Sequence, residues 1–296
     1  MRAISSVSRQ TQTFSVLDRT LAIETDSDEI MRYIDGAFRR LRVDPDRDSR
    51  PRDFASILYG LGTAPSISFN AAPVTFEHPT KVDSAFHAAF YGSAKLFRLS
   101  MRRSTDWHSV YAAALRIRDR AVLIAGASGI GKTTLTLELL RRGAQLYGDE
   151  FACIRKSDRF VVGFPRTFMI REETLSVIEQ PPLRSTCERS APREQAVAGR
   201  VWDHIDPAEV FGEDVFASPA RLGAAILLSR DPERPPSAER LSSAVASTEL
   251  VARFNRAFVE FTHFADIAGL FAGIPCYRLW IGEPRATADA LLGVLT

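Results

Sequence analysis

The sequence is poor in cysteine and has no long apolar run, and each shortage excludes a class of protein. Its three cysteines, Cys153, Cys187 and Cys276, lie far apart and lack the spacing of a metal site. An odd, sparse set of cysteines is typical of a reducing compartment, which predicts a cytoplasmic protein. No apolar run reaches the roughly 18 residues of a membrane span, and the N-terminus lacks the apolar core of a signal peptide. We therefore expect no membrane partner.

An excess of charge of one sign is also missing. The 38 Lys and Arg residues nearly balance the 36 Asp and Glu residues, which leaves a net charge of +2. Paired arginines such as Arg39-Arg40 and Arg102-Arg103 are scattered rather than gathered into one basic stripe, so no nucleic-acid partner is expected. With 45% hydrophobic and 25% charged residues, the 296-residue chain has the composition of a globular protein and is long enough for two modest domains.

The first third of the chain contains no catalytic motif, and its role is left open. Its patterns predict a small α+β module over residues 1–103, with a catalytic domain over residues 104–296. The elements expected in the module are strands at 14–23, 54–61 and 66–76 and helices at 28–41 and 82–101. In the second part, single strands are expected at 107–117 and 145–155, a loop at 180–198, and a long helix at 248–272.

Residues 126–133 read Gly-Ala-Ser-Gly-Ile-Gly-Lys-Thr, a full match to the phosphate-binding pattern G-x-x-x-x-G-K-[ST]. The apolar run 121–125 before it predicts a buried strand. The leucine-rich segment 133–142 after it predicts a helix, which Gly143 ends. The motif thus has the strand-loop-helix context that it requires, and we expect a nucleotide-phosphate site.

The residue types in this motif suit the binding of phosphate. Gly126, Gly129 and Gly131 let the backbone wrap closely around phosphate oxygens, and the N–H groups at the helix start favour an anion. Lys132 can reach the β- and γ-phosphates, and the Thr133 hydroxyl can ligate Mg²⁺. Lys132 is one of four lysines in a chain that otherwise uses arginine. The remaining residues expected to contact the nucleotide are Ser128, Ile130 and Thr134.

A phosphate-binding loop also needs carboxylates, which hold Mg²⁺ and accept the proton of an acceptor hydroxyl. Asp149 and Glu150 are the candidates, directly after Gly148, which permits a close approach of the backbone. The interval from Thr133 is shorter than in ABC and RecA-type ATPases, and residues 145–148 are less apolar than a standard Walker B strand. A purely structural role of both carboxylates in a turn stays open.

The segment 126–154, GASGIGKTTLTLELLRRGAQLYGDEFACI, resembles the catalytic core of HPr kinase/phosphorylase and, more closely, of HPr-kinase-related proteins. The shared features are the loop, a leucine-rich helix ending in Arg-Gly, and an acidic pair soon after it. Phe164-Pro165-Arg166 occupies the place of a Pro-Arg segment in the relatives. The resemblance covers residues 121–170 and leaves residues 1 to about 100 without a counterpart.

This resemblance implies an α/β fold, a P-loop kinase core of the phosphoenolpyruvate-carboxykinase-like type, that uses ATP and Mg²⁺. It implies phosphate transfer to a serine of a peptide or small protein, as in kinases of ribosomal peptide precursors, and it favours a homo-oligomer. Asp149 matches the family's base, and Glu150 with Thr133 would complete the Mg²⁺ sphere. With Lys132, an arginine would neutralise the γ-phosphate; the candidates are Arg166 and, less well placed, Arg193 and Arg200.

The sequence departs from the family in two respects, and two other functions stay open. No clear motif matches the family's arginine-rich loop on the acceptor side. Tyr111 stands where the family has a histidine, and His108 lies three residues earlier. The acceptor could instead be a small metabolite, or the protein could be a nucleotide-gated regulator that transfers no phosphate, which the Tyr111 departure favours. An intact set of Lys132, Thr133 and Asp149 argues against the regulator. The sequence does not decide between ATP, GTP and pyrophosphate as the donor.

Overall fold

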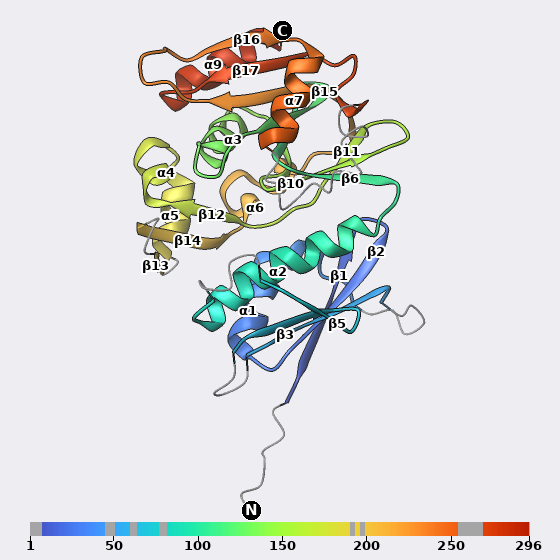
Figure 1. Ribbon diagram of the computed structural model, residues 1–296. Helices are drawn as coiled ribbons and strands as arrows, with labels where there is room; N and C mark the ends of the chain where they lie inside the picture. Colours follow the sequence, from blue (N-terminus) through green and yellow to red (C-terminus); the bar gives the residue numbers. More distant parts are fainter. Residues whose placement is uncertain are drawn as a thin grey trace, which may run out of the picture. The chain divides into compact units, whose positions relative to one another are not determined.

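The computed structural model shows a mixed α/β protein with three β-sheets (Figure 1). It describes residues 8–44, 51–59, 64–76, 82–189, 193–195, 199–253 and 269–295. The chain divides into two compact units, Met1–Thr105 and Asp106–Thr296. Among the described residues, no helix combines the length and the apolar character that a membrane span requires.

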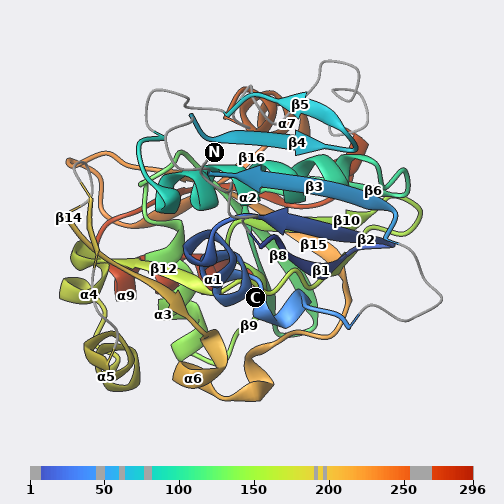
Figure 2. The same ribbon diagram turned by 90° about the horizontal axis from the view of Figure 1, so that it is seen from below.

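The first unit is a five-stranded sheet with two helices. The strands lie in the order β1-β2-β3-β4-β5, as Figure 2 shows, and β2 and β3 are parallel. Helix α1 begins after Ser27, whose hydroxyl accepts a hydrogen bond from the Ile30 N–H group. The elements are β1 (Gln10–Val16), β2 (Arg19–Thr25), α1 (Asp28–Ala37), a 3₁₀ turn (Arg39–Leu41), β3 (Asp53–Leu58), β4 (Ser66–Phe69), β5 (Ala72–Val74) and α2 (Ala85–Arg102).

Two segments predicted as single strands are hairpins. The segment 14–23 turns at Leu17, whose φ is 59°, so that β1 pairs with β2. The segment 66–76 turns at Asn70 and Ala71, with φ of 50° and 65°. Two successive positive φ angles are the geometry of a type I′ hairpin turn, which glycine usually provides. Without glycine at these turns, the sequence pattern did not reveal them.

Asp53 in β3 is a fully buried carboxylate of the first unit. Arg19 donates to both of its oxygens, at 2.6 and 2.9 Å, and Arg103 forms a second ion pair at 3.0 Å. Asn70 and Ser100 donate the remaining hydrogen bonds. Burial alone would raise the pKa of Asp53, but the hydrogen bonds from Arg19, Asn70 and Ser100 lower it below its ordinary value. The network ties the end of α2 to the sheet.

We expect Asp53→Ala to lower the free energy of unfolding by about 3–5 kcal/mol, because it leaves the largely buried Arg19 side chain, 13% exposed, without its counter-charge. Asp35→Ala is the control, since Asp35 forms a solvent-exposed pair with Arg42 and its loss should cost about 1 kcal/mol or less. Because the folded-state pKa of Asp53 is lowered, its contribution is present at neutral pH and disappears as the pH falls through that value. Urea unfolding of both variants at neutral and acidic pH measures the free energy of unfolding. An equal loss of stability in Asp53→Ala and Asp35→Ala would contradict the stabilising role given to the buried Asp53 network.

The second unit contains a nine-stranded sheet and a separate three-stranded sheet. The large sheet has the order β6-β10-β11-β15-β8-β7-β9, with β17 beside β15 and β16 beside β17. Strands β8, β15 and β17 are parallel. The segment 107–117, predicted as one strand, is divided at Ala112 into two strands, β6 and β7, which pair with different neighbours. Its strands are β6 (Trp107–Tyr111), β7 (Ala113–Ile117), β8 (Arg120–Ala125), β9 (Gln145–Gly148), β10 (Phe151–Arg155), β11 (Phe160–Val162), β15 (Ala220–Ser229), β16 (Ser237–Leu241) and β17 (Cys276–Trp280).

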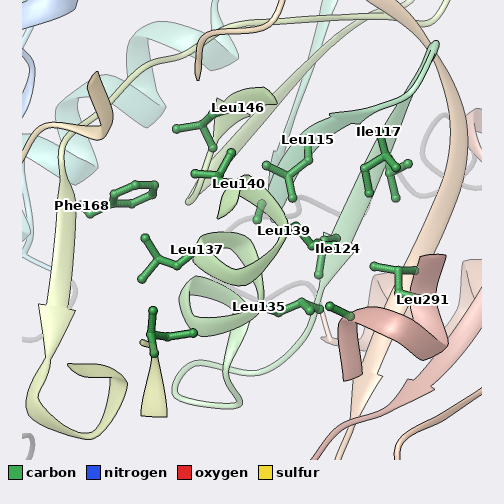
Figure 3. Packing of buried hydrophobic residues seen from close by; sticks show 14 of the residues in the cluster. Leu115, Ile117, Ile124, Leu135, Leu137, Leu139, Leu140, Leu146, Phe168 and Leu291 are labelled. Atoms are coloured by element: carbon green, nitrogen blue, oxygen red, sulfur yellow. The ribbon is translucent and has the colours of Figure 1, made fainter. Parts of the chain in front are cut away.

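Helix α3 (Lys132–Arg141) is buried on nearly all sides. Its four leucines pack with Ile124 of β8 and with Leu291 of α9 (Pro284–Val294), as Figure 3 shows. Thr136 and Glu138 of the same helix are also buried. Gly143, with φ of 86°, follows the helix end, as the sequence predicted. The packing holds the start of α3 in a defined position against β8.

The remaining elements form a small layer with the sheet β12-β14-β13 (Figure 1). The expected loop 180–198 contains α5, whose residues Leu183, Thr186 and Cys187 form a buried stripe at helical spacing. The helix expected at 248–272 begins earlier, in α7 (Ser243–Arg253), and residues 254–268 lie outside the described residues. The elements are β12 (Phe168–Arg171), α4 (Glu172–Val177), α5 (Pro181–Arg189), β13 (Arg193–Gln195), β14 (Gly199–Ile205), α6 (Pro207–Phe211) and a 3₁₀ turn (Glu213–Val215).

Candidate phosphate-binding site

The glycine loop, residues 126–131, connects β8 to α3. A Cβ atom on Gly126 would lie 2.9 Å from Ile130 Cγ2 and 3.1 Å from Leu228 Cβ, so a larger residue does not fit there. Gly129 and Gly131 have φ of 77° and 118°, in the region that side chains rarely adopt. Glycine is therefore required at all three positions of the motif, and the loop is compact.

Lys132 is buried at the start of α3, with 7% of its surface exposed. Its Nζ donates hydrogen bonds to the carbonyl oxygens of Gly126 and Ala127, each at 3.0 Å. The Nζ atom also lies 4.8 Å from the ring centre of Tyr111. Burial lowers the pKa of Lys132, while the charge of Asp149 acts in the opposite direction. The ammonium group is held at the loop with loop carbonyls as its partners.

Asp149 lies directly beside the helix start. The Thr133 hydroxyl donates to Asp149 Oδ2 at 2.8 Å. The other oxygen, Oδ1, is buried and has no hydrogen-bond partner among the described residues. Burial raises the pKa of Asp149, and the hydrogen bond from Thr133 and the charge of Lys132 oppose this rise. A buried carboxylate oxygen without a partner is available to bind a cation or to accept a proton.

The acidic pair breaks the strand that the sequence predicted over 145–155. Strand β9 ends at Gly148 and β10 begins at Phe151, so Asp149 and Glu150 form the turn between them. A Cβ atom on Gly148 would lie 2.7 Å from the Phe151 carbonyl oxygen. Glycine is needed at this close approach of the backbone, and the turn directs Asp149 to Thr133.

Glu150 and Arg166 form an ion pair. Arg166 is largely buried, with 11% of its side chain exposed, and its charge opposes the rise that burial causes in the pKa of Asp149. The structure thus places Glu150 against Arg166, whereas the carboxylate that bonds to Thr133 is Asp149. The prediction that Glu150 joins Thr133 as a Mg²⁺ ligand would require it to exchange this arginine for the metal.

Tyr111 ends β6 and lies at the centre of the site. Burial raises the pKa of Tyr111, as does the charge of Asp149, while a hydrogen bond with Ser128 opposes the rise. The pairing of β6 with β10 is continuous from Trp107 to Tyr111. His108 is three residues from Tyr111, so the two side chains face opposite sides of the sheet. His108 therefore does not take the place of Tyr111 in this register.

Two arginines that the sequence analysis did not select border the glycine loop. Arg171 Nη1 lies 3.5 Å from the position of a Cβ atom on Gly129. Arg230 Nη2 donates to the Ile130 carbonyl oxygen at 3.3 Å. Arg171 ends β12 and Arg230 follows β15, so both come from elements outside the motif. Both arginines are far from the motif in the sequence, and nothing in that spacing indicates a place at the glycine loop. The fold brings them there.

The other candidates of the sequence analysis are placed as follows. The Thr134 hydroxyl lies 3.2 Å from the Thr174 hydroxyl of α4. Arg193 stands opposite Val201 in the β13-β14 pair, and Arg200 stands opposite Glu194.

The oxygen atoms around Thr133 suit a Mg²⁺ ion that is bound together with a phosphate, rather than a metal ion that protein side chains hold alone. Among the described residues, no group of three or more His, Cys, Asp or Glu side chains could hold a metal ion. Mg²⁺ is usually bound by one or two carboxylates together with waters and substrate phosphates. The Thr133 hydroxyl and the partnerless Asp149 Oδ1 are oxygen ligands of this kind. The residues present therefore fit a Mg²⁺ that arrives with a phosphate ligand.

Comparisons with known proteins find similarity to solved structures but none to a family model or a curated protein. No protein-family model matches the sequence, and no curated protein matches it. A solved structure described as "Structure of the Hpr(Ser) kinase/phosphatase from Coxiella burnetii" is similar to this chain with a TM-score of 0.33 and 16% sequence identity. The match covers 64% of this chain and 90% of that chain. This similarity is too distant to assign a reaction.

Proposed function

We propose that the protein is an ATP- and Mg²⁺-dependent phosphotransferase that moves a γ-phosphate to a hydroxyl group. The observation that carries the proposal is the hydrogen bond from Thr133 to Asp149 beside a complete glycine loop. It joins the two parts of a phosphoryl-transfer site, a residue for the phosphate-bound metal and a carboxylate for the incoming nucleophile. A regulator that only binds a nucleotide has no need of a base for an incoming nucleophile.

Each residue has a defined part in the proposed reaction. The backbone N–H groups of the glycine loop and the Lys132 ammonium bind the β- and γ-phosphates. Thr133 and Asp149 would hold Mg²⁺, and the chemistry that this ion supplies when bound is neutralisation of charge on the phosphate oxygens. Lys132 exchanges its present carbonyl partners for phosphate oxygens.

Asp149 is also the proposed base. The acceptor oxygen attacks the γ-phosphorus, and its proton passes to the Asp149 carboxylate. The bond between the γ-phosphorus and the bridging oxygen breaks, and ADP leaves with that electron pair. A base acts best when its pKa lies near the working pH, and burial of Asp149 shifts its pKa in that direction.

The proposed acceptor is a serine hydroxyl on a peptide or small protein. The resemblance of residues 121–170 to HPr-kinase-related proteins supports this choice over a metabolite. Incubation with γ-labelled ATP and Mg²⁺ tests it, with candidate precursor peptides from the genomic neighbourhood and with a metabolite extract as acceptors. Label on a peptide serine is the expected result. Label only on a small molecule would make the protein a metabolite kinase, and tight binding without transfer to any acceptor would make it a regulator.

A further inference from the structure

The arginine that the sequence analysis favoured for the γ-phosphate is already engaged. Arg166 is largely buried and ion-paired with Glu150. A phosphoryl-transfer site nevertheless needs positive charge beyond one lysine, because charge develops on the transferred group in the transition state. Guanidinium groups suit this task, since their planar donors match phosphate oxygens in pairs. The residues that could supply the charge must therefore be sought among the other arginines at the loop.

Arg171 is exposed and stands beside Gly129. Its side chain forms no hydrogen bond or ion pair with any residue that the structure describes, although Glu172 and Glu173 follow it in α4. Burial is the main cause of the lowered pKa of Lys132, and the charge of Arg171 adds to it; the same charge opposes the rise in the pKa of Tyr111. Arg171 therefore lies at the glycine loop with its charge available to an anion bound there.

Arg230 is also exposed, and its single hydrogen bond holds it against the loop carbonyl of Ile130. Its Nη2 atom lies 3.9 Å from the position of a Cβ atom on Gly131, where Ile281 Cδ1 lies 3.4 Å away. The guanidinium group leaves its other N–H donors for an anion. Arg230 thus meets the loop at a different glycine from Arg171.

We propose that Arg171 and Arg230 bind the donor's phosphates together, with Arg171 at the terminal phosphate and Arg230 at the phosphates that remain on the nucleoside diphosphate. This inference rests on the proposed function, which identifies the phosphate donor as ATP. The division follows from the two contacts with the loop: Arg171 stands at Gly129, farther from the start of α3, while Arg230 is bonded to the Ile130 carbonyl and stands at Gly131, directly before α3.

Calorimetry on the full chain tests this division without relying on catalysis. Dissociation constants for ATP, ADP and inorganic tripolyphosphate are measured for the wild type, Arg171→Gln and Arg230→Gln. Arg221→Gln is the matched control, because Arg221 lies near the start of β15, about 30 Å along the strand from Arg230. We expect Arg230→Gln to weaken ATP and ADP alike by about tenfold, and Arg171→Gln to weaken ATP and tripolyphosphate about tenfold but not ADP.

The outcomes separate this inference from the proposed function. If both variants bind all three ligands as Arg221→Gln does, the inference is overturned; equal losses of ATP and ADP in Arg171→Gln would overturn the division between the two arginines. A third outcome is that the wild type binds tripolyphosphate, that both variants bind it more weakly, and that no acceptor is phosphorylated. In that case the two arginines form an anion site, and the proposal that the protein is a kinase is wrong. A lower rate of transfer in Arg171→Gln, by about 10³-fold, would add a catalytic role.

Discussion

Replacing Asp149 by asparagine is expected to lower the rate of phosphoryl transfer by about 10²–10⁴-fold while leaving ATP binding intact. Asparagine keeps the shape of the side chain and can still accept the hydrogen bond from Thr133, but it cannot take up the acceptor's proton. Rates of transfer and dissociation constants for ATP are measured on the same preparations. Asp119→Asn is the control, since Asp119 is exposed and precedes β8, at the end of that strand away from the glycine loop.

Asp149→Asn also separates the two roles proposed for Asp149, as the base and as a ligand of Mg²⁺. If Asp149 acts mainly as the base, the Mg²⁺ concentration that gives half-maximal binding of ATP stays the same. If it acts mainly as a metal ligand with Thr133, that concentration rises. An Asp149→Asn protein that phosphorylates its acceptor at the normal rate would contradict both parts.

The pH profile gives a second test of the same carboxylate. A base must be ionised, so the rate falls as the pH drops through its pKa. Because burial raises the pKa of Asp149 above the ordinary 3.8, the acid limb of the profile should lie above that pH. The limb should be missing from the residual activity of Asp149→Asn. A limb at the same pH in both proteins would assign the titration to another group.

Replacing Lys132 by alanine is expected to weaken ATP binding by roughly 10- to 100-fold, the loss of a charged hydrogen bond to phosphate. The ammonium group is held at the glycine loop by two carbonyl oxygens, in position to meet an incoming anion. Equilibrium binding of ATP measures the loss. Lys156→Ala is the control, because Lys156 lies in the turn between β10 and β11. Equal affinity in the two variants would mean that the glycine loop is not the phosphate site.

Much of the site could be predicted because its residues are close in sequence. The glycine loop and the helix that ends before Gly143 depend on one strand-loop-helix segment. Asp149 follows soon after this segment, but the sequence analysis had placed Glu150, not Asp149, beside Thr133. The strand break at Asp149 was missed, since residues 145–155 carry β-forming side chains on both sides of it.

The residues contributed by distant elements could not be predicted. Arg171 and Arg230 reach the loop from β12 and β15, and nothing in their own sequence context distinguishes them from solvated arginines. The pairing of Glu150 with Arg166 also depends on the fold, because it commits two residues that the sequence analysis had assigned to the metal and the phosphate. Tertiary contacts determine which charged side chains pair with each other and which remain available to a ligand. The periodicity of the sequence contains no information about these contacts.

The most direct test of a phosphate-binding glycine loop is a crystal structure with Mg²⁺ and a non-hydrolysable ATP analogue. We predict that the β- and γ-phosphates lie on the N–H groups of the glycine loop with Lys132 moved from the Gly126 and Ala127 carbonyls onto them. The metal should contact the Thr133 hydroxyl, and Asp149 should face the γ-phosphate. A nucleotide bound elsewhere, or an empty loop at a concentration that saturates the protein in solution, would contradict the proposed function.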